Sequence, residues 1–331
     1  MAIRRAIIMS DILAKNDCIF VAGARGLVGS SIVRTLHAKG FKNILVPTHT
    51  ELDLMDAETV KLFFKRHQPR YVFLAAAKVG GIYANNTYPA DFIFNNLSIQ
   101  NNVIHESWRQ DVKRLIFLGS SCVYPRDCPQ PIKEEYLMTG DLERTNRPYA
   151  IAKIAGIELC WAYNRQYGTQ FLSAMPTNTY GSLDNFHLEN SHVMPALIRK
   201  MHEAKIENRS EVEIWGTGKP RREFLYVDDL AEACLFLMSL PEDQYVNLLK
   251  KQMGPWVNIG CGEDLTIAEL AELVAEVVGY SGKFCWNVNQ PDGTLRKLLD
   301  VSLLASLGWK PQVNLKDGIQ KAYAAYLAAL G

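Results

Sequence analysis

A tyrosine and a lysine at helical spacing are the clearest candidates for proton chemistry in the sequence. Tyr149 and Lys153 belong to the run Tyr149-Ala-Ile-Ala-Lys153. On a helix this spacing puts both side chains on one face, with the ammonium near the phenol. We expect the cation to lower the tyrosine pKa, so that the hydroxyl exchanges a proton with a carbonyl oxygen near neutral pH. Because such a pair alone is more often an ordinary exposed helix face, the prediction depends on companion residues.

Two companion segments carry further proton-handling side chains. Gly119-Ser120-Ser121-Cys122 follows a buried apolar run, where open α/β sheets bind their ligands. Ser120 is suited to hydrogen-bond a carbonyl, and Cys122 shares its side if the chain stays extended. The thiol is either a packed small hydrophobe or a base. His192, in Asn190-Ser191-His192 at an expected helix start, is either a cap or surface residue or an acid or base near neutral pH.

A glycine-rich run near the start of the chain is a candidate phosphate loop. The run Gly23-Ala24-Arg25-Gly26-Leu27-Val28-Gly29 lies between an apolar segment and a helix-like stretch. Glycines there allow a tight turn, and the N–H groups of the helix N-terminus bind pyrophosphate. A strand, a glycine turn and a helix also occur for structural reasons alone. The position at the first strand-to-helix turn of an alternating chain favours dinucleotide binding.

The end of the second expected strand decides between NAD and NADP. NAD-binding folds carry an acidic residue there, which binds the ribose 2′-hydroxyl. This chain has Val46-Pro47-Thr48-His49 instead, and its next carboxylates, Glu51 and Asp53, could serve the adenine. Arg25 can offer a bidentate fork to a 2′-phosphate. We therefore expect NADP(H) as the cofactor.

Strand-like and helix-like stretches alternate through the first half of the chain. This alternation predicts an α/β fold with a Rossmann doubly wound parallel sheet, covered by helices on both faces. The expected strands are 18–22, 43–46, 71–75, 114–119 and 170–175, and the expected helices are 28–38, 57–67, 90–110 and 149–167.

The amino-acid composition changes after Pro176. A polar stretch at 177–191 is expected to be a loop that covers a site. We expect a smaller mixed α/β C-terminal substrate-binding domain here, with strands at 211–215 and 256–259 and helices at 192–204, 227–239, 266–278 and from 315. The predicted division is 1–179 for the NADP-binding domain, including an N-terminal extension at 1–17, and 180–331 for the substrate domain. Some later segments are expected to return to the first domain.

Composition excludes several classes of function. The 36 basic residues nearly balance 35 acidic ones, so neither nucleic acid nor an anionic membrane is an expected partner. Seven scattered cysteines without a C-x-x-C pair predict neither a disulfide framework nor a metal site, which suits a reducing compartment. Ser10-Asp11 interrupts the leading apolar run, and no segment approaches the ~18 apolar residues of a membrane span. We expect a cytoplasmic protein.

Taken together, the motifs resemble the GDP-L-fucose synthase family of the extended short-chain dehydrogenase/reductase superfamily. The tyrosine and lysine mark only the superfamily, whereas Ser-Ser-Cys with Asn-Ser-His marks the epimerase/reductase branch. The resemblance runs from Ile19 onward. Beyond the runs above, it rests on Leu74-Ala-Ala-Ala-Lys78-Val-Gly-Gly81, Ala84-Asn-Asn-Thr-Tyr-Pro-Ala-Asp91, Tyr163-Asn-Arg-Gln-Tyr-Gly168, Met175-Pro-Thr-Asn178, Asp184-Asn-Phe-His187, Arg222-Glu-Phe-Leu225 and Asp292-Gly-Thr-Leu-Arg-Lys-Leu-Leu-Asp300.

The resemblance implies a bifunctional enzyme. Its substrate would be GDP-4-keto-6-deoxy-D-mannose, inverted at carbons 3 and 5 and then reduced at carbon 4 by NADPH to GDP-L-fucose. The implied roles are Cys122 as the base, His192 as the acid on the opposite face, Tyr149 as proton donor to the carbon-4 oxygen, Lys153 as its tuning cation, and Ser120 as the group that orients the carbonyl. Inversion beside a ketone needs two such proton-handling groups and an enolate-stabilising site.

The resemblance also implies binding residues. Besides the glycine loop, those for the cofactor are His49, Asp53, Leu54, Lys153 and His192, with Leu118, Gly119, Ser120, Ser121, Pro176, Thr177, Asn178 and Thr179 along the nicotinamide. Those for the GDP-sugar are Lys200, Trp215, Arg222, Asp292 and Lys297. Arg222 and Lys297 suit a diphosphate, and Trp215 suits guanine, with core packing as an equal alternative. His49 and Lys200 depart from the family, which has arginine at both positions.

Three further expectations concern the assembly, the substrate and the class of protein. The family implies a homodimer through the helices near 90–110 and 149–167. A related substrate, such as a GDP-4-keto dideoxyhexose or a GDP-heptose intermediate, is the alternative among enzymes. A non-catalytic dinucleotide sensor is the alternative outside enzymes, but such a protein would be expected to lose Tyr149, Lys153 or Cys122, and all three are present.

Overall fold

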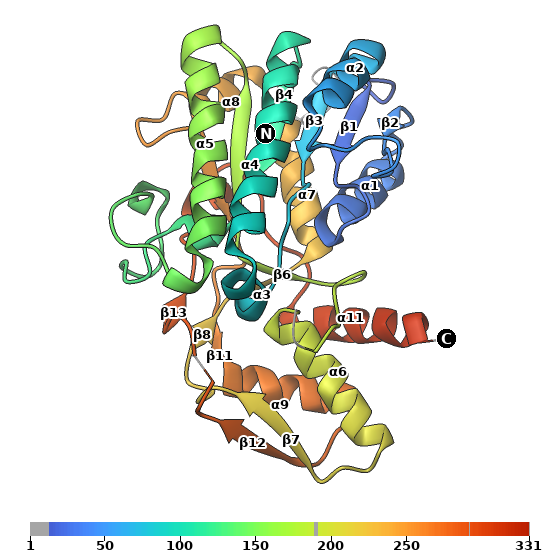
Figure 1. The fold of residues 1–331 in the computed structure, drawn as a ribbon, viewed down its shortest axis with the longest axis vertical. Helices are drawn as coiled ribbons and strands as arrows, with labels where there is room; N and C mark the ends of the chain where they lie inside the picture. Colours follow the sequence, from blue (N-terminus) through green and yellow to red (C-terminus); the bar gives the residue numbers. More distant parts are fainter. Residues whose placement is uncertain (1–12, 189–190, 291, 331) are drawn as a thin grey trace, which may run out of the picture.

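A six-stranded parallel sheet organises the larger part of the molecule, in a computed structural model that describes residues 13–188, 191–290 and 292–330 (Figure 1). The strand order is β10-β5-β4-β3-β1-β2, with every neighbouring pair parallel. This sheet confirms the predicted Rossmann-type fold. Its strands are β1 Ile19–Ala22, β2 Ile44–Leu45, β3 Tyr71–Leu74, β4 Arg114–Leu118, β5 Phe171–Pro176 and β10 Trp256–Ile259.

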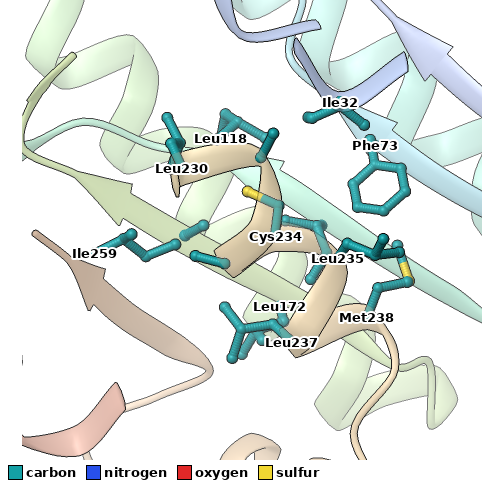
Figure 2. Close-up of a cluster of buried hydrophobic side chains, with 14 of the residues drawn as sticks. Ile32, Phe73, Leu118, Leu172, Leu230, Cys234, Leu235, Leu237, Met238 and Ile259 are labelled. Carbon is teal, nitrogen blue, oxygen red and sulfur yellow. The ribbon is translucent and has the colours of Figure 1, made fainter. Parts of the chain in front are cut away.

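Helices cover both faces of the sheet. Alternate strand residues point to opposite sides, so each face contributes buried side chains to its own core. One core contains Val21 of β1 and Phe73 of β3 with residues of α1 (Leu27–Ala38) and α7 (Val227–Met238). Figure 2 shows α7 side chains in this core, close to Ile32 and Leu118. The core on the opposite face contains the strand residues that alternate with those of the first core, such as Phe20 of β1 and Val72 of β3. Three helices pack against them, namely α2 (Ala57–His67), α4 (Pro89–Arg109) and α5 (Arg147–Tyr167).

A second group of elements lies beyond the carboxyl ends of these strands, in the lower part of Figure 1. Its core joins α6 (Val193–Ile206), α9 (Ile267–Val278) and α11 (Leu315–Leu330). Around them lie three small sheets, made of β11-β8-β13, β12-β7 and β6-β9. Their bounds are β6 Asn178–Tyr180, β7 Glu211–Trp215, β8 Arg221–Arg222, β9 Phe224–Tyr226, β11 Leu265–Thr266, β12 Lys283–Asn287 and β13 Arg296–Lys297.

Several short elements were not expected from the sequence. They are the helices α3 (Ile82–Thr87), α8 (Glu242–Leu249) and α10 (Ser302–Ser306) and the 3₁₀ turns η1 (Ser121–Val123), η2 (Glu134–Tyr136) and η3 (Arg144–Asn146). The expected division at residue 179 stays a prediction, and most of the N-terminal extension lies outside the described residues. Within the described ranges, no helix is both long and apolar enough to cross a membrane.

Candidate active site

Three of the five catalytic candidates meet at the carboxyl end of β4. Ser120 is the N-cap of η1, and its Oγ accepts the Cys122 backbone N–H at 3.2 Å. Ser120 also hydrogen-bonds the Tyr149 hydroxyl, which reaches it from the first turns of α5. The backbone at Gly119 comes so close to Met175 that an added Cβ would collide with the sulfur. A larger residue at position 119 would require the Met175 side chain to move.

Lys153 is buried beneath this group, with 3% of its surface exposed. Its Nζ donates to the Leu118 carbonyl at 2.7 Å and lies 5.9 Å from the centroid of the Tyr149 ring. Burial lowers the pKa of Lys153 to about 7. The ammonium thus shares a face of α5 with the phenol, as predicted, but its hydrogen bond goes to the end of β4.

The expected lowering of the Tyr149 pKa is wrong for this structure. Desolvation raises the pKa of Tyr149 well above its ordinary value, negative charge on Cys122 raises it further, and the Ser120 hydrogen bond opposes both. Lys153 does not offset the desolvation, because its charge is itself disfavoured by burial. The phenol is therefore protonated at neutral pH and available as a proton donor.

A cation from β13 lies against the thiol. Lys297 Nζ is 3.7 Å from Cys122 Sγ, within hydrogen-bonding distance of sulfur. Cys122 is half-buried and keeps a free thiol, so it is not a packed core cysteine. Arg222, which pairs with Lys297 in the β8–β13 register, feels the charge of Cys122 as well. The candidate base Cys122 therefore interacts with two basic side chains, Lys297 by direct contact and Arg222 through its charge.

His192 is the N-cap of α6, but its side chain makes no capping hydrogen bond. His192 is exposed and stands at the N-cap position, so the alternative of a cap or surface residue agrees with its place in the structure, although its side chain makes no capping bond. The protein around the imidazole and then the positive charge of Lys297 lower the pKa of His192, although the residue keeps access to solvent. Lys297 consequently acts on both Cys122 and His192. Asn190, the first residue of the Asn-Ser-His motif, lies outside the described residues.

A buried carboxylate ties the substrate side of the site to the cofactor side. Glu223 is fully buried, and its two carboxylate oxygens accept the backbone N–H groups of Gly262 at 2.7 Å and Leu299 at 3.0 Å. Its backbone carbonyl accepts the side chains of Thr177 at 3.3 Å and Asn178 at 2.9 Å. Glu223 thereby holds the segment that carries Lys297 and the segment expected along the nicotinamide.

The glycine loop fits a dinucleotide pyrophosphate. Gly23 has φ +84°, and an added Cβ would lie 2.6 Å from the backbone nitrogen of Ala76. A Cβ on Gly29 would collide with the Gly23 carbonyl, so the loop can pack this closely only with glycine. The helix α1 begins after Gly26 with no side-chain cap and no acidic residue in its first turn. Its N-terminus therefore suits an anion.

Positive and negative groups share the region expected to bind the adenosine end of the cofactor. Arg25 is exposed, and its charge adds to the Thr48 hydrogen bonds that lower the pKa of Glu51. His49 Nε2 lies 3.8 Å from the Asp53 carboxylate, with both side chains exposed. Leu54 is instead partly buried against the core of the adjacent sheet face. Arg25 and His49 are thus both accessible to a 2′-phosphate.

The candidates for the nucleotide end of the substrate make contacts at two places. Lys200 Nζ lies 5.4 Å from the centroid of the Trp215 ring and donates to the Glu213 carbonyl at 3.1 Å. Trp215 is 42% exposed, so the alternative that it packs in the core is wrong. The Asp292 carboxylate accepts the backbone N–H of Thr217 at 2.7 Å and its hydroxyl at 2.8 Å. Asp292 thereby fixes the loop after Trp215.

Lys153 makes protein stability depend on pH in a way that can be measured. The unfolded lysine binds its proton up to its ordinary pKa, whereas the folded lysine releases it above about 7. Between these values the unfolded state holds more protons, so this group makes stability rise with pH, by up to about 1.4 kcal/mol per pH unit. We expect Lys153→Met to lose this rise in urea unfolding curves from pH 7.5 to 9.5. Exposed Lys250→Met is the control, and an unchanged pH slope in Lys153→Met would contradict the assignment.

The fold and the site define a class of nucleotide-cofactor enzyme that combines a Rossmann sheet with a tyrosine and lysine proton-transfer pair. The model of the NAD dependent epimerase/dehydratase family matches residues 19–248. The chain belongs to this family and, within it, to the GDP-L-fucose synthases. It is 59% identical to GDP-L-fucose synthase 1 of Arabidopsis thaliana over 319 residues, which cover 96% of this chain and 95% of that protein.

Two further comparisons agree. The GDP-L-fucose synthase of Escherichia coli K12 is 50% identical over 93% of this chain and 96% of its own length. A GDP-D-glycero-L-gluco-heptose synthase from Campylobacter jejuni, solved in the presence of NADPH, superposes with a TM-score of 0.88 at 40% identity. That likeness covers 95% of this chain and 99% of the solved one. The family resemblance stated from the sequence is confirmed.

Proposed function

We propose that the protein inverts carbons 3 and 5 of GDP-4-keto-6-deoxy-D-mannose and reduces carbon 4 with NADPH, which yields GDP-L-fucose. The observation that carries this proposal is the meeting of Ser120, Cys122 and Tyr149 at the end of β4, under a cation that also acts on His192. A simple reductase needs the serine and the tyrosine. A thiol and an imidazole beside them serve a second kind of proton transfer.

The epimerisation uses two proton-handling side chains. Cys122, as thiolate, takes the proton from the carbon next to the ketone, so that an S–H bond forms and the C–H electron pair becomes an enolate. Ser120 and Tyr149 hydrogen-bond the enolate oxygen. His192, as imidazolium, returns a proton to the opposite face of the same carbon. The same groups act at carbons 3 and 5, because both flank the carbon-4 ketone.

The reduction uses the protonated phenol. Bound NADPH supplies a hydride to carbon 4. Tyr149 donates its proton to the carbon-4 oxygen as the carbonyl becomes a hydroxyl, and Ser120 holds that oxygen in line. The Tyr149 phenol is protonated when this step begins. Lys153, next to the resulting phenolate, regains a favourable charge and stabilises it.

The remaining candidates divide between the two ligands. We propose that the glycine loop from Gly23 to Gly29 binds pyrophosphate and that Arg25 and His49 contact the 2′-phosphate, while Asp53 and Leu54 border the adenosine. Lys153, His192, Leu118 to Ser121 and Pro176 to Thr179 would line the nicotinamide. Lys200, Trp215, Arg222, Asp292 and Lys297 would bind the GDP-sugar. The pairing of Lys200 with Trp215 supports a nucleotide site there, because a cation and an exposed aromatic ring suit phosphate and base.

The direct test mixes the purified protein with GDP-4-keto-6-deoxy-D-mannose and NADPH. We expect NADPH absorbance to fall and the product to have the L-galacto configuration by NMR. Separate titrations with NADPH and NADH should give tighter binding of NADPH, since Arg25 can hold the additional phosphate. No NADPH oxidation with this sugar would reject the proposed function.

A related GDP-heptose reaction is the second candidate, favoured by the likeness to the heptose synthase from Campylobacter jejuni. The same catalytic side chains would serve it, and the difference would lie in the room around carbon 6. Competition between the two sugars in one NADPH assay separates the candidates. A higher kcat/KM for the heptose would replace the first proposal.

We further propose a cytoplasmic homodimer. Its interface would lie on the exposed faces of α4 and α5, where Phe94, Ile151 and Tyr167 keep 63%, 38% and 46% of their surface. Seven free cysteines support a reducing compartment. Light scattering coupled to size exclusion gives the mass directly, and a single chain at micromolar concentration would refute the dimer.

A further inference from the structure

The contact between Lys297 and Cys122 points to a role for this lysine beyond substrate binding. The family resemblance implies that Lys297 binds the GDP-sugar, where a lysine suits the diphosphate. In the structure its ammonium lies 3.7 Å from the Cys122 sulfur. Within the described ranges, no carboxylate forms an ion pair with Lys297. The Cys122 sulfur is therefore the group that the Lys297 ammonium contacts, and the same charge also acts on the Cys128 thiol.

The backbone around Lys297 is held by hydrogen bonds on both sides. The Lys297 carbonyl accepts the Glu223 N–H at 3.3 Å, and the next residue, Leu298, donates its N–H to Gln130 Oε1 at 2.9 Å. Leu299 then donates to the Glu223 carboxylate at 3.0 Å. These bonds hold the Lys297 backbone beside β8, and the side chain brings the ammonium from there to the Cys122 sulfur.

Lys297 is the charged residue that contacts the Cys122 sulfur. The other charged and titratable groups nearby have different partners or lie further away. From α5 comes Tyr149, whose phenol is protonated at neutral pH and hydrogen-bonds Ser120. From β8 comes Arg222, whose guanidinium donates to the carbonyls of Arg221 at 2.9 Å and Asp292 at 3.4 Å. His192, from α6, lies within the electrostatic reach of Lys297.

We propose that Lys297 is the positioning residue of the epimerisation base: its ammonium hydrogen-bonds the Cys122 sulfur and keeps it in the thiolate form that removes the substrate proton. This inference rests on the proposed function for its catalytic consequence, but the charge state of the thiol does not depend on the sugar. A cation in hydrogen-bonding contact favours the anionic sulfur. The same charge disfavours a second proton on His192, which makes the imidazolium a stronger acid once it forms.

The test that needs no substrate is the pH profile of Cys122 alkylation. The full-length protein is treated with iodoacetamide between pH 5.5 and 9.5, and the rate is read from the Cys122 peptide by mass spectrometry, which separates it from the other six cysteines. We expect Lys297→Met to slow alkylation at pH 6.5 by about tenfold and to move the rise of the profile to higher pH. Lys297→Arg should restore most of the rate at pH 6.5, since it keeps the charge.

Two controls make the result decisive. Exposed Lys250→Met should match the wild type, and Cys122→Ala should remove the modified peptide. A merely structural effect of Lys297→Met would change the rate by the same factor at every pH, including the plateau. Such a uniform change, or profiles that coincide for Lys297→Met and the wild type, would overturn the proposal.

A second measurement links the thiolate to catalysis. Deuterium uptake at carbons 3 and 5 of the keto sugar should fall about tenfold in Lys297→Met at pH 7 and recover toward pH 9. A loss confined to KM, with no pH dependence, would return Lys297 to diphosphate binding alone. If the wild type itself shows no uptake, the proposed substrate is wrong, and the alkylation profile still decides the state of the thiol.

Discussion

Replacing Cys122 with alanine is expected to stop exchange of the protons at carbons 3 and 5 with heavy water. Alanine removes the only thiol that hydrogen-bonds Lys297 in the described structure and leaves no base at the η1 turn. General base catalysis contributes about 10²–10⁴-fold, so deuterium uptake, measured by NMR of the recovered sugar, should fall by about that factor. Any NADPH oxidation that persists should yield a 4-hydroxy sugar with the original configuration at both carbons.

The matched control for this substitution is Cys285→Ala. Cys285 is an exposed thiol on β12, 3.3 Å from Glu211, and takes no part in the site. Its replacement should leave exchange unchanged. NADPH binding by Cys122→Ala, followed by fluorescence, verifies that the variant is folded. Wild-type exchange in a folded Cys122→Ala protein would assign the base to another residue.

Replacing Tyr149 with phenylalanine is expected to have the second large effect, on hydride transfer. Phenylalanine keeps the ring in its place on α5 but removes the hydroxyl that hydrogen-bonds Ser120. Without a proton donor at the carbon-4 oxygen, the reduction should slow by about 10²–10⁴-fold. Exchange should decline much less, because Cys122 and His192 remain and Ser120 still hydrogen-bonds the enolate oxygen.

The Tyr149→Phe variant should separate the two activities, because reduction should fall much more than proton exchange. Single-turnover NADPH absorbance reports reduction, and NMR in heavy water reports exchange in the same sample. Tyr323→Phe changes a tyrosine on α11, whose hydroxyl lies 3.0 Å from His202 Nδ1, and should alter neither rate. Equal losses of reduction and exchange in Tyr149→Phe would mean that Tyr149 serves both steps as an indispensable group, contrary to the proposed division of roles.

The main sheet follows from short-range patterns in the sequence. The runs that became β1, β3, β4 and β10 are buried along their whole length and, apart from Arg114 and Asn258, are apolar, as expected of strands covered on both faces. The two-residue strands β8 and β13 have no such pattern. They form only where segments that are distant in the sequence meet in the folded chain, which pairs Arg222 of β8 with Lys297 of β13.

Part of the site follows from local sequence in the same way. Tyr149 and Lys153 are four residues apart, and Ser120 and Cys122 belong to one turn. Because each pair is close in the sequence, the residue types and their spacing were enough to predict the proton chemistry. The contact of Lys297 with Cys122 crosses 175 positions of the chain. The direction of the Tyr149 pKa was also missed, because spacing reveals which groups are neighbours but not how much water reaches them.

The buried carboxylate of Glu223 has a consequence for how this protein could acquire another substrate. The carboxylate fastens the stretches near residues 262 and 299, and the backbone carbonyl of Glu223 fastens the stretch near residue 177. A longer or shorter loop at any one of them would strain the other two. Divergence toward a different sugar is therefore expected to proceed by exchange of side chains on an unmoved frame, while insertions accumulate away from this junction.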